Sequence, residues 1–353
     1  MTRPFRIRNR TLGSNAPVWL VAEMSANHGG DFARAVRILE AAARAGADAV
    51  KLQTYTADTL TIACDNDYFR IKGTLWEGRT LHDLYREAAM PMEWTPGLIQ
   101  AGRDLGVAVF STPFDPSAVD YLESLDVPAH KVASFEIVDI PLLRKIGATG
   151  KPVIMSTGMA TPEEIDEAVE TLRASGCRDL ALLKCTSAYP SPPEAMNLRA
   201  IPLLAQRYGV PAGLSDHTLG TAAAVAAVAL GACIIEKHFT LARADGGPDS
   251  AFSLEPHEFA AMVRDVQEAH AALGRPVLEP CEKELASRVF RRSLFVVRDV
   301  ARGEPFTPDN VRSIRPGHGM HPRHLDEVLG RRAAKDIPRG TPLAPEHIEG
   351  DRS

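Results

Sequence analysis

Short apolar runs alternate with amphipathic stretches along most of the chain, beginning at Trp19. Candidate helices lie between the apolar runs, for example at 32–45, 162–175 and 221–230. Alternation of strands and helices is typical of a parallel sheet. Eight such units in about 255 residues predict an α/β fold, a (β/α)8 TIM barrel. The predicted strands are 19–23, 49–53, 107–112, 130–134, 152–156, 180–185, 211–215 and 233–237.

The alternation breaks between residues 54 and 91, a stretch too long for an ordinary loop between a strand and a helix. Long loops at the catalytic face of a barrel usually serve as lids or binding loops. An open, doubly wound sheet is the structural alternative for the whole pattern. It is less favoured, because no Gly-x-Gly-x-x-Gly follows the first predicted strand.

The character of the sequence changes near residue 274. Residues 254–273 have the pattern of a last barrel helix, and short strands with Gly/Pro turns follow Phe290. We therefore expect a barrel over 1–276, a linker over 277–289 and a small β-rich domain over 290–353. Residues 288–339 hold 12 Lys/Arg against 6 Asp/Glu. This balance indicates either a solvated surface or a cap that reaches an anionic ligand in the barrel.

Composition and charge exclude several classes of protein. The net charge of -5 over 353 residues gives no case for nucleic-acid binding. Five cysteines without a Cys-x-x-Cys spacing argue against a disulfide framework or a thiolate zinc site, and they fit a reducing cytoplasm. The apolar run at 18–22 is too short for a signal peptide. No apolar run approaches the roughly 20 residues that a membrane helix needs.

Two histidines end neighbouring predicted strands. His217 follows the run LSD, and His238 follows the run IIEK. Successive strands of a parallel barrel bring their carboxyl ends to one mouth, where such folds carry out their chemistry. Two imidazoles brought together there are typical of a metal site with open positions. Asp249, in a Gly-Gly-Pro-Asp turn, is either a third group of the metal shell or a structural turn residue.

Every predicted strand end carries a Lys, Glu, His, Ser or Thr. A single lysine of this kind is more often a surface charge. Eight polar strand ends together indicate a polar ligand, because charges are rarely buried without partners. Lysines with hydroxyl groups suit a phosphate and a carboxylate, and so a small, doubly anionic substrate. The candidates are Lys51, Lys131, Ser134, Ser156, Ser187 and Ser215.

Carboxylates accompany these lysines and hydroxyls. Of Glu23 and Glu136, one could orient a hydroxyl or a water and the other could move protons. Gln53 lies at the end of the second strand beside them. For Glu136 the structural alternative is a salt bridge to Lys131 across the same strand end.

These motifs resemble the sialic acid synthase family, and the resemblance covers nearly the whole chain. The C-terminal module resembles the antifreeze-like (SAF) domain. The segments that carry the resemblance are 22–28 (AEMSANH), 51–55 (KLQTY), 110–115 (FSTPFD), 131–136 (KVASFE), 156–160 (STGMA), 214–218 (LSDHT), 236–240 (EKHFT), 252–254 (FSL) and 315–317 (RPG).

The resemblance implies a chemistry. Phosphoenolpyruvate condenses through its C3 with the open-chain aldehyde of an amino sugar, water adds at C2, and phosphate leaves by C–O cleavage. A divalent ion, usually Mn²⁺ or Mg²⁺, binds His217 and His238 and polarises the aldehyde oxygen. The lysines and serines named above hold phosphoenolpyruvate. The groups that surround the reacting centre are Glu23, Gln53, Glu136 and Asp249. In a domain-swapped homodimer, Arg315 of one subunit contacts the sugar of the other.

Within the family, the local sequence resembles the pseudaminate branch at 23–28, 84–88 and 243–253. Ser250 stands after Asp249 where the N-acetylneuraminate branch usually has histidine. The pseudaminate branch uses 2,4-diacetamido-2,4,6-trideoxy-altrose, which is less polar than N-acetylmannosamine. The lid residues that we expect to suit its methyl group are Tyr68, Phe69, Leu75 and Trp76. Synthesis of N-acetylneuraminate or legionaminate is the alternative.

Two functions from other classes compete with this one. A catalytically silent carbohydrate- or ice-binding protein would have a decayed barrel mouth, which the intact Glu23, Lys51 and His217 argue against. A pyruvate-dependent aldolase would need a Schiff-base lysine in an apolar pocket. Lys184 and Lys237, at strand ends, are the candidates for that role.

Overall fold

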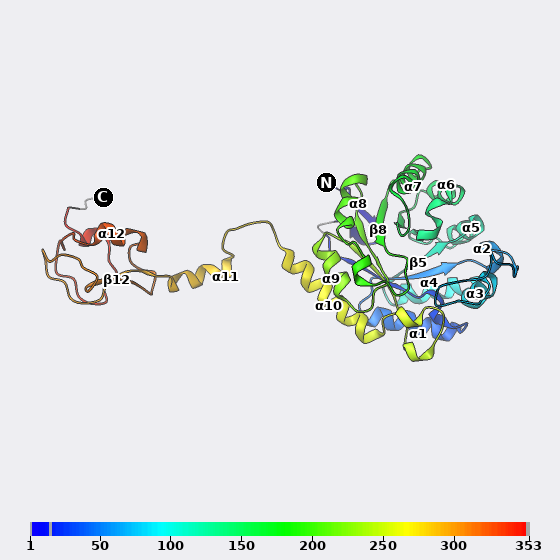
Figure 1. Cartoon of the computed structure of the whole chain (residues 1–353), viewed down its shortest axis with the longest axis horizontal. Coiled ribbons are helices and arrows are strands. Elements are labelled where there is room, and N and C mark those ends of the chain that lie inside the picture. The colour runs from blue at the N-terminus through cyan, green and yellow to red at the C-terminus, as the bar shows by residue number, and fades with distance from the viewer. Residues whose placement is uncertain (1, 14–15, 351–353) are drawn as a thin grey trace. The chain divides into compact units, whose positions relative to one another are not determined.

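Eight parallel strands close into a barrel in the N-terminal part of the chain (Figure 1). The computed structural model describes residues 2–13 and 16–350. β10 closes the barrel against β3, with His238 level with Glu23. The strands follow one another around the barrel in chain order: β3 (Trp19–Glu23), β4 (Ala49–Thr54), β5 (Ala108–Pro113), β6 (His130–Val132), β7 (Val153–Ser156), β8 (Leu180–Cys185), β9 (Ala212–Asp216) and β10 (Ile234–His238). The predicted (β/α)8 TIM barrel is confirmed.

Helices between the strands surround the barrel, and capping residues in the sequence mark where they begin. Thr161 and Glu164 form a capping box at the start of α7, with Pro162 at the first helical position. Asp31 caps α1 by accepting hydrogen bonds from two backbone N–H groups. The helices are α1 (Phe32–Arg44), α4 (Thr95–Asp104), α5 (Pro116–Ser124), α6 (Ile140–Ala148), α7 (Pro162–Ala174), α8 (Ala200–Tyr208), α9 (Ala222–Ala229) and α10 (Pro256–Leu273).

The two faces of each barrel strand belong to different apolar layers. One layer lies between strands and helices and includes Leu39, Leu172 and Phe259. The other fills the inside of the barrel, where the rings of Trp19 and Phe110 stack with their centroids 5.5 Å apart. The hairpin of β1 (Phe5–Ile7) and β2 (Arg10–Leu12) belongs to this inner layer. The sequence pattern did not predict this hairpin, whose strands have three residues each.

The fourth strand of the barrel, β6, is shorter than predicted. β6 ends at Val132, and the predicted strand residue Ser134 begins the 3-10 helix η3 (Ser134–Val138) together with Glu136. The long insertion after β4 holds two helices, α2 (Ala57–Leu60) and α3 (Leu81–Ala88). An isolated bridge between Arg70 and Thr80 closes the loop between them.

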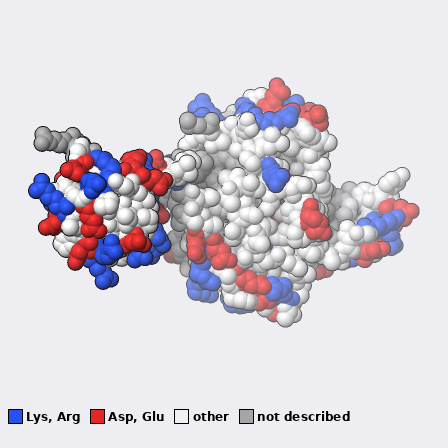
Figure 2. Space-filling model, turned by 60° about the vertical axis from the view of Figure 1, so that its left-hand side comes forward, with Lys and Arg blue, Asp and Glu red and all other residues white. Residues whose placement is uncertain are grey.

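The chain divides by its contacts into two units, Met1–Gly274 and Arg275–Ser353. The second unit contains α11 (Glu282–Leu285), an antiparallel pair of β11 (Ser293–Val296) and β12 (Val311–Ile314), and α12 (Leu325–Val328). Its own apolar core includes Leu294, Phe306 and Ile337. On the face drawn in Figure 2, basic and acidic side chains are interspersed over this unit. Among the described residues, no helix is long and apolar enough to span a membrane.

Candidate active site

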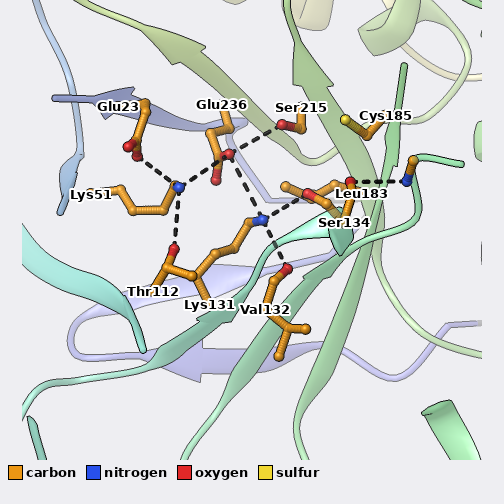
Figure 3. A network of polar contacts seen from close by, with 12 residues as sticks. Glu23, Lys51, Thr112, Lys131, Val132, Ser134, Leu183, Cys185, Ser215 and Glu236 are labelled. Atoms are coloured by element: carbon orange, nitrogen blue, oxygen red, sulfur yellow. Dashed lines mark hydrogen bonds and ion pairs between the residues drawn. The ribbon is translucent and has the colours of Figure 1, made fainter. Parts of the chain in front are cut away.

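Four buried side chains of alternating charge lie side by side near the carboxyl ends of the barrel strands (Figure 3). They are Glu23, Lys51, Glu236 and Lys131. The Lys51 Nζ lies 2.7 Å from the Glu23 carboxylate and 3.6 Å from Glu236 Oε1. The Lys131 Nζ lies 3.9 Å from the same Glu236 oxygen. Each ammonium thus has a carboxylate partner, which is how buried charges are tolerated.

The charges set one another's protonation. Burial alone would raise the pKa of Glu236, but Lys131 and Lys51 together hold it below its ordinary value. Burial would lower the pKa of Lys51, and Glu23 and Glu236 more than offset this effect. For Lys131, burial is the stronger influence and lowers the pKa of the ammonium. Lys51 and Glu236 therefore keep their charges at neutral pH.

Hydroxyl groups complete this charged cluster. The Lys131 Nζ donates a hydrogen bond of 2.7 Å to Ser156 Oγ, and Ser215 Oγ donates one of 3.1 Å to Glu236. The backbone N–H of Gly158 donates to Ser134 Oγ over 3.0 Å. A Cβ at position 158 would lie 2.3 Å from Ser187 Oγ and 2.7 Å from Ser134 Oγ, so a larger residue there would displace both hydroxyl groups. The strand ends thus bring two lysines and three serines together, as the sequence predicted.

The two predicted metal histidines meet at the mouth. Their ring centroids lie 5.3 Å apart. His217 Nδ1 lies 3.0 Å from the carbonyl oxygen of Thr186, so that an Nδ1–H donates to it and Nε2 keeps its lone pair. Burial lowers the pKa of His238 well below its ordinary value, and its Nδ1 has no hydrogen-bond partner among the described residues. Burial would lower the pKa of His217 as well, but its contacts with Cys185 and the Thr186 carbonyl more than offset this effect and raise it. A metal binds the neutral form of an imidazole, so an ion at this pair would displace any proton from the ring nitrogen that it binds.

This pair fits a metal ion that takes its remaining ligands from outside the protein. No group of three or more His, Cys, Asp or Glu side chains within 2–13 and 16–350 could hold an ion by itself. A divalent ion bound here would need oxygen ligands from water or substrate, as at sites with open positions. The carboxyl of Asp249, a predicted member of the metal shell, lines the same cavity and accepts a hydrogen bond from Ser25 Oγ.

Two carboxyl groups in the cavity wall, those of Glu136 and Asp249, have raised pKa values. Burial raises the pKa of Glu136 to about 7, although Lys131 opposes the shift. Glu136 Oε2 has no hydrogen-bond partner among the described residues. The alternative of a salt bridge from Glu136 to Lys131 is not what the structure has, since the Lys131 ammonium contacts Ser156, Val132 and Glu236. Burial also raises the pKa of Asp249.

These groups line a cavity of about 390 Å³ at the mouth of the barrel. The predicted site residues in its wall are Lys51, Gln53, Lys131, Ser134, Glu136, Ser156, Ser215, His217, His238 and Asp249. The outer wall is largely apolar and comes mainly from the insertion after β4. Its members include Tyr55, Leu60, Ile71, Trp76, Leu81, Leu84, Tyr85 and Phe114.

The insertion lies over the cavity, but the prediction was wrong for three of the four expected lid residues. Tyr68, Phe69 and Leu75 are not in the wall, and Tyr68 is 90% exposed. Trp76 is in the wall, and its indole N–H donates a hydrogen bond of 3.1 Å to the carbonyl oxygen of Pro248. Hydrophobicity identified the segment, whereas the direction of each side chain depends on turns that the pattern does not reveal.

Three predicted site residues lie away from the cavity wall. Glu23 is buried behind it, where it holds Lys51 and accepts a hydrogen bond of 3.0 Å from Gln53. Ser187 Oγ lies on the same side of Gly158 as Ser134 Oγ and 3.8 Å from the sulfur of Cys185, but Ser187 is not in the cavity wall. Arg315 is exposed in the second unit, immediately after β12.

The two lysines that resembled Schiff-base candidates are also absent from this wall. Lys184 Nζ donates to the carbonyl oxygen of Cys185, and Lys237 forms an ion pair of 2.7 Å with Asp216. An alternating strand sends successive side chains to opposite faces, so not every polar strand end faces the mouth.

Sequence analysis missed three residues of the site. Glu236 is the shared partner of both lysines, yet it stands inside an apolar run, and the charge within that run was the signal. Tyr189 packs its ring 4.4 Å from that of His217 and 5.9 Å from that of Trp76. Cys185 Sγ lies 3.9 Å from His217 Nδ1. No spacing motif marks the last two.

Comparison with known proteins places this site among synthases. The sequence model of the NeuB family matches residues 38–277, and that of the SAF domain matches residues 291–349. The chain is 46% identical to a pseudaminic acid synthase of Campylobacter jejuni over 92% of this chain and 95% of that protein. It is 44% identical to a pseudaminic acid synthase of Helicobacter pylori over 94% of this chain and 98% of that protein.

A solved structure has the same architecture. It is an N-acetylneuraminic acid synthetase from Leptospira borgpetersenii in complex with citrate, which is 33% identical. The match has a TM-score of 0.73 and covers 81% of this chain and 95% of that chain.

Proposed function

The chain belongs to the NeuB family, and from this membership we propose that it synthesises pseudaminic acid. It is an enzyme that condenses phosphoenolpyruvate with 2,4-diacetamido-2,4,6-trideoxy-altrose, giving a nine-carbon 2-keto sugar acid and phosphate. The observation that carries this proposal is the likeness to two pseudaminic acid synthases over more than nine-tenths of the chain. The NeuB family model, at residues 38–277, spans the site residues from Lys51 to Asp249.

The charged cluster binds phosphoenolpyruvate. Lys131 offers an ammonium whose carboxylate neighbour is 3.9 Å away, so an incoming phosphate or carboxylate can approach it closely. The hydroxyl groups of Ser134, Ser156 and Ser215 line the same cavity. Those of Ser134 and Ser156 can donate to the oxygens of phosphoenolpyruvate, whereas that of Ser215 donates to Glu236 and holds this carboxylate in place. Ser187 Oγ lies beside Ser134 Oγ at Gly158, and Ser187 is the remaining serine proposed to hold phosphoenolpyruvate, although it lies outside the wall.

The reaction forms one C–C bond and one C–O bond and breaks another C–O bond. C3 of phosphoenolpyruvate attacks the aldehyde carbon of the sugar, and the aldehyde oxygen gains a proton. Water adds at C2 and releases its protons, and C2 becomes the ketone as phosphate departs with its bridging oxygen. Glu136 supplies the proton, since a carboxyl group with a pKa of about 7 is partly protonated at neutral pH. Glu23, Gln53 and Asp249 form a hydrogen-bonded chain through Ser25 that orients the sugar and the water.

His217 and His238 would hold a divalent ion, Mn²⁺ or Mg²⁺. When bound, such an ion supplies Lewis-acid polarisation of a carbonyl oxygen. The imidazole rings are held by Thr186 and by the aromatic side chains of Tyr189 and Phe252. These contacts fix the donor atoms before any ion arrives.

The outer, apolar wall selects the sugar. A 6-deoxy sugar with two acetamido groups presents three methyl groups, whereas N-acetylmannosamine presents one methyl group and a hydroxymethyl arm. The side chains of Leu81, Ile71 and Trp76 cover this part of the cavity with hydrocarbon. An apolar wall favours the deoxy sugar because it offers no hydrogen-bond partner to a buried hydroxyl group. The alternative products remain N-acetylneuraminate and legionaminate.

Replacing Leu81 with asparagine should lower kcat/KM for the trideoxy sugar about tenfold, because methyl burial in a pocket is worth about 1–3 kcal/mol. The matched control is Leu75→Asn in the same insertion, where the side chain is 57% exposed and lies outside the wall. Steady-state kinetics on both variants measures the effect. Equal kinetics for the two variants would remove the insertion from sugar selection.

The second unit completes the enzyme in the proposed assembly. A domain-swapped homodimer would bring Arg315 of one subunit to the sugar of the other, and its exposure leaves the guanidinium available. The domain proposal is a barrel over 1–276, a linker over 277–289 and the SAF domain over 290–353. We place the enzyme in the cytoplasm, in keeping with the free cysteines at Cys64, Cys177, Cys185, Cys233 and Cys281.

Borohydride reduction in the presence of pyruvate distinguishes this chemistry from that of a Schiff-base aldolase. Among the lysines in the wall, Lys131 has its pKa lowered by burial and is the one to examine. We expect no covalent adduct by mass spectrometry, because the family reaction proceeds through phosphoenolpyruvate and not through an imine. A pyruvyl adduct on Lys131 would replace the proposed function with an aldolase.

A further inference from the structure

A second buried ion pair lies directly behind the two metal histidines. The Lys237 Nζ and the Asp216 Oδ2 are 2.7 Å apart, and both side chains are fully buried. The ammonium also donates a hydrogen bond of 2.6 Å to the carbonyl oxygen of Thr218, and Asp216 Oδ1 accepts one of 2.8 Å from the Thr218 backbone N–H. The pair therefore joins β10 to the end of β9 and to the loop that follows.

The register of the strands ties this pair to the site. Lys237 lies level with Asp216, and Glu236 lies level with Ser215. Ser215 and Glu236 bond to each other on the inner face of the barrel. Successive side chains alternate between faces, so His217 and His238 return to the inner face. Each metal histidine thus directly follows one member of the outer ion pair along its strand.

Burying the ion pair of Asp216 and Lys237 costs free energy, because its surroundings are apolar. Leu214 and Ile235, the preceding residues on the same outer face, belong to the apolar layer between strands and helices. Burial lowers the pKa of Lys237, although Asp216 opposes this. Apolar residues of similar volume commonly replace a buried ion pair without loss of stability. Global stability alone therefore gives little reason for charges at these two positions.

We propose that Asp216 and Lys237 are positioning residues: their ion pair locks the ends of β9 and β10 together and so fixes the spacing of the His217 and His238 imidazoles for a divalent cation. The inference rests on the proposed function, because it takes the two histidines as the metal ligands. The pair does not line the cavity, so neither residue contacts substrate or the ion. The ion pair acts on the histidines through the backbone, because Asp216 directly precedes His217 and Lys237 directly precedes His238.

The test uses the full-length, metal-free protein and Mn²⁺ alone, without substrates. The variant Asp216→Asn/Lys237→Met removes both charges at once and leaves no unpaired one. We expect its Kd for Mn²⁺, measured by titration calorimetry and by the electron paramagnetic resonance signal of free Mn²⁺, to rise about 10–100-fold, as for other groups that orient metal ligands. Phosphoenolpyruvate affinity without metal should change less than about twofold, because the double variant leaves the Lys51 and Lys131 cluster intact.

Two controls separate positioning from general loosening of the fold. Leu172→Ala opens a cavity in the same apolar layer, on α7, and should lower the Tm without changing the Kd for Mn²⁺. Asp216→Asn/Lys237→Leu also keeps an acceptor for Thr218 and leaves no unpaired charge, so it serves where the first double variant folds poorly. It should weaken Mn²⁺ binding to a similar extent. A Kd that follows Tm across all variants would overturn the proposal.

The possible outcomes distinguish a failure of the positioning role from a failure of the proposed function on which it rests. Wild-type protein that binds no Mn²⁺ would overturn the metal role of the two histidines and the positioning role with it. Wild-type protein that binds Mn²⁺, together with a double variant of unchanged Kd, would overturn the positioning role alone. A raised Kd in the double variant with an unchanged Kd in Leu172→Ala supports it.

Discussion

Replacing His217 or His238 with alanine should reduce the rate of phosphate release in the presence of Mn²⁺ by about 10³-fold or more. Lewis-acid stabilisation of this kind is worth several kcal/mol, and about 1.4 kcal/mol corresponds to a factor of ten. Both rings lie at the mouth of the barrel and not in its apolar layers. The barrel should therefore remain folded, with a far-ultraviolet circular dichroism spectrum like that of the wild type.

His82→Ala is the matched control for this experiment. His82 pairs with Asp58 outside the cavity wall, so its loss should leave the rate within about twofold of the wild type. The decisive comparison is the rate at saturating Mn²⁺ after treatment with EDTA and reconstitution. A His217→Ala enzyme that turns over at the wild-type rate after EDTA treatment would contradict the metal role.

Glu136→Gln should lower kcat about 10²–10⁴-fold, the usual contribution of a positioned acid or base. Glutamine keeps the size of the side chain but cannot exchange a proton. Burial raises the pKa of Glu136 to about 7, so its carboxyl is mostly protonated at pH 6 and mostly ionised at pH 8. If Glu136 gives its proton to the aldehyde oxygen, kcat falls as the pH rises through about 7.

The pH profile of kcat distinguishes this acid role from a structural one. We expect the inflection near pH 7 in the wild type to disappear in Glu136→Gln, while the KM for phosphoenolpyruvate changes little. Glu163→Gln, on the exposed first turn of α7, is the control and should keep the wild-type profile. Glu136→Gln with the same inflection as the wild type would assign that pKa to another group.

Periodicity predicted the barrel well because it reports burial. A strand buried on both faces is a continuous apolar run, and the helices between such runs carry caps such as Thr161 and Asp31. The same runs located the mouth, since their carboxyl ends carry Lys51, Lys131 and His217. The local sequence therefore predicted the level along the barrel axis at which each polar residue lies on its strand.

Periodicity did not reveal which way each polar side chain points. Glu236, Lys237 and His238 are consecutive, and only the first and third reach the cavity wall. Lys237 pairs with Asp216 on the outer face, a partner that is 21 positions away in the sequence. The lid shows the same limit, because Tyr68 faces solvent and Trp76 faces the cavity within one loop.

Phosphate release from phosphoenolpyruvate with Mn²⁺, measured separately with three sugars, tests the central claim most directly. The sugars are 2,4-diacetamido-2,4,6-trideoxy-altrose, N-acetylmannosamine and the legionaminate precursor. We predict release with the first sugar alone, one phosphate for each nine-carbon acid formed. Release with N-acetylmannosamine or the legionaminate precursor in its place would contradict the assigned substrate, and no release with any of the three would contradict the synthase function itself.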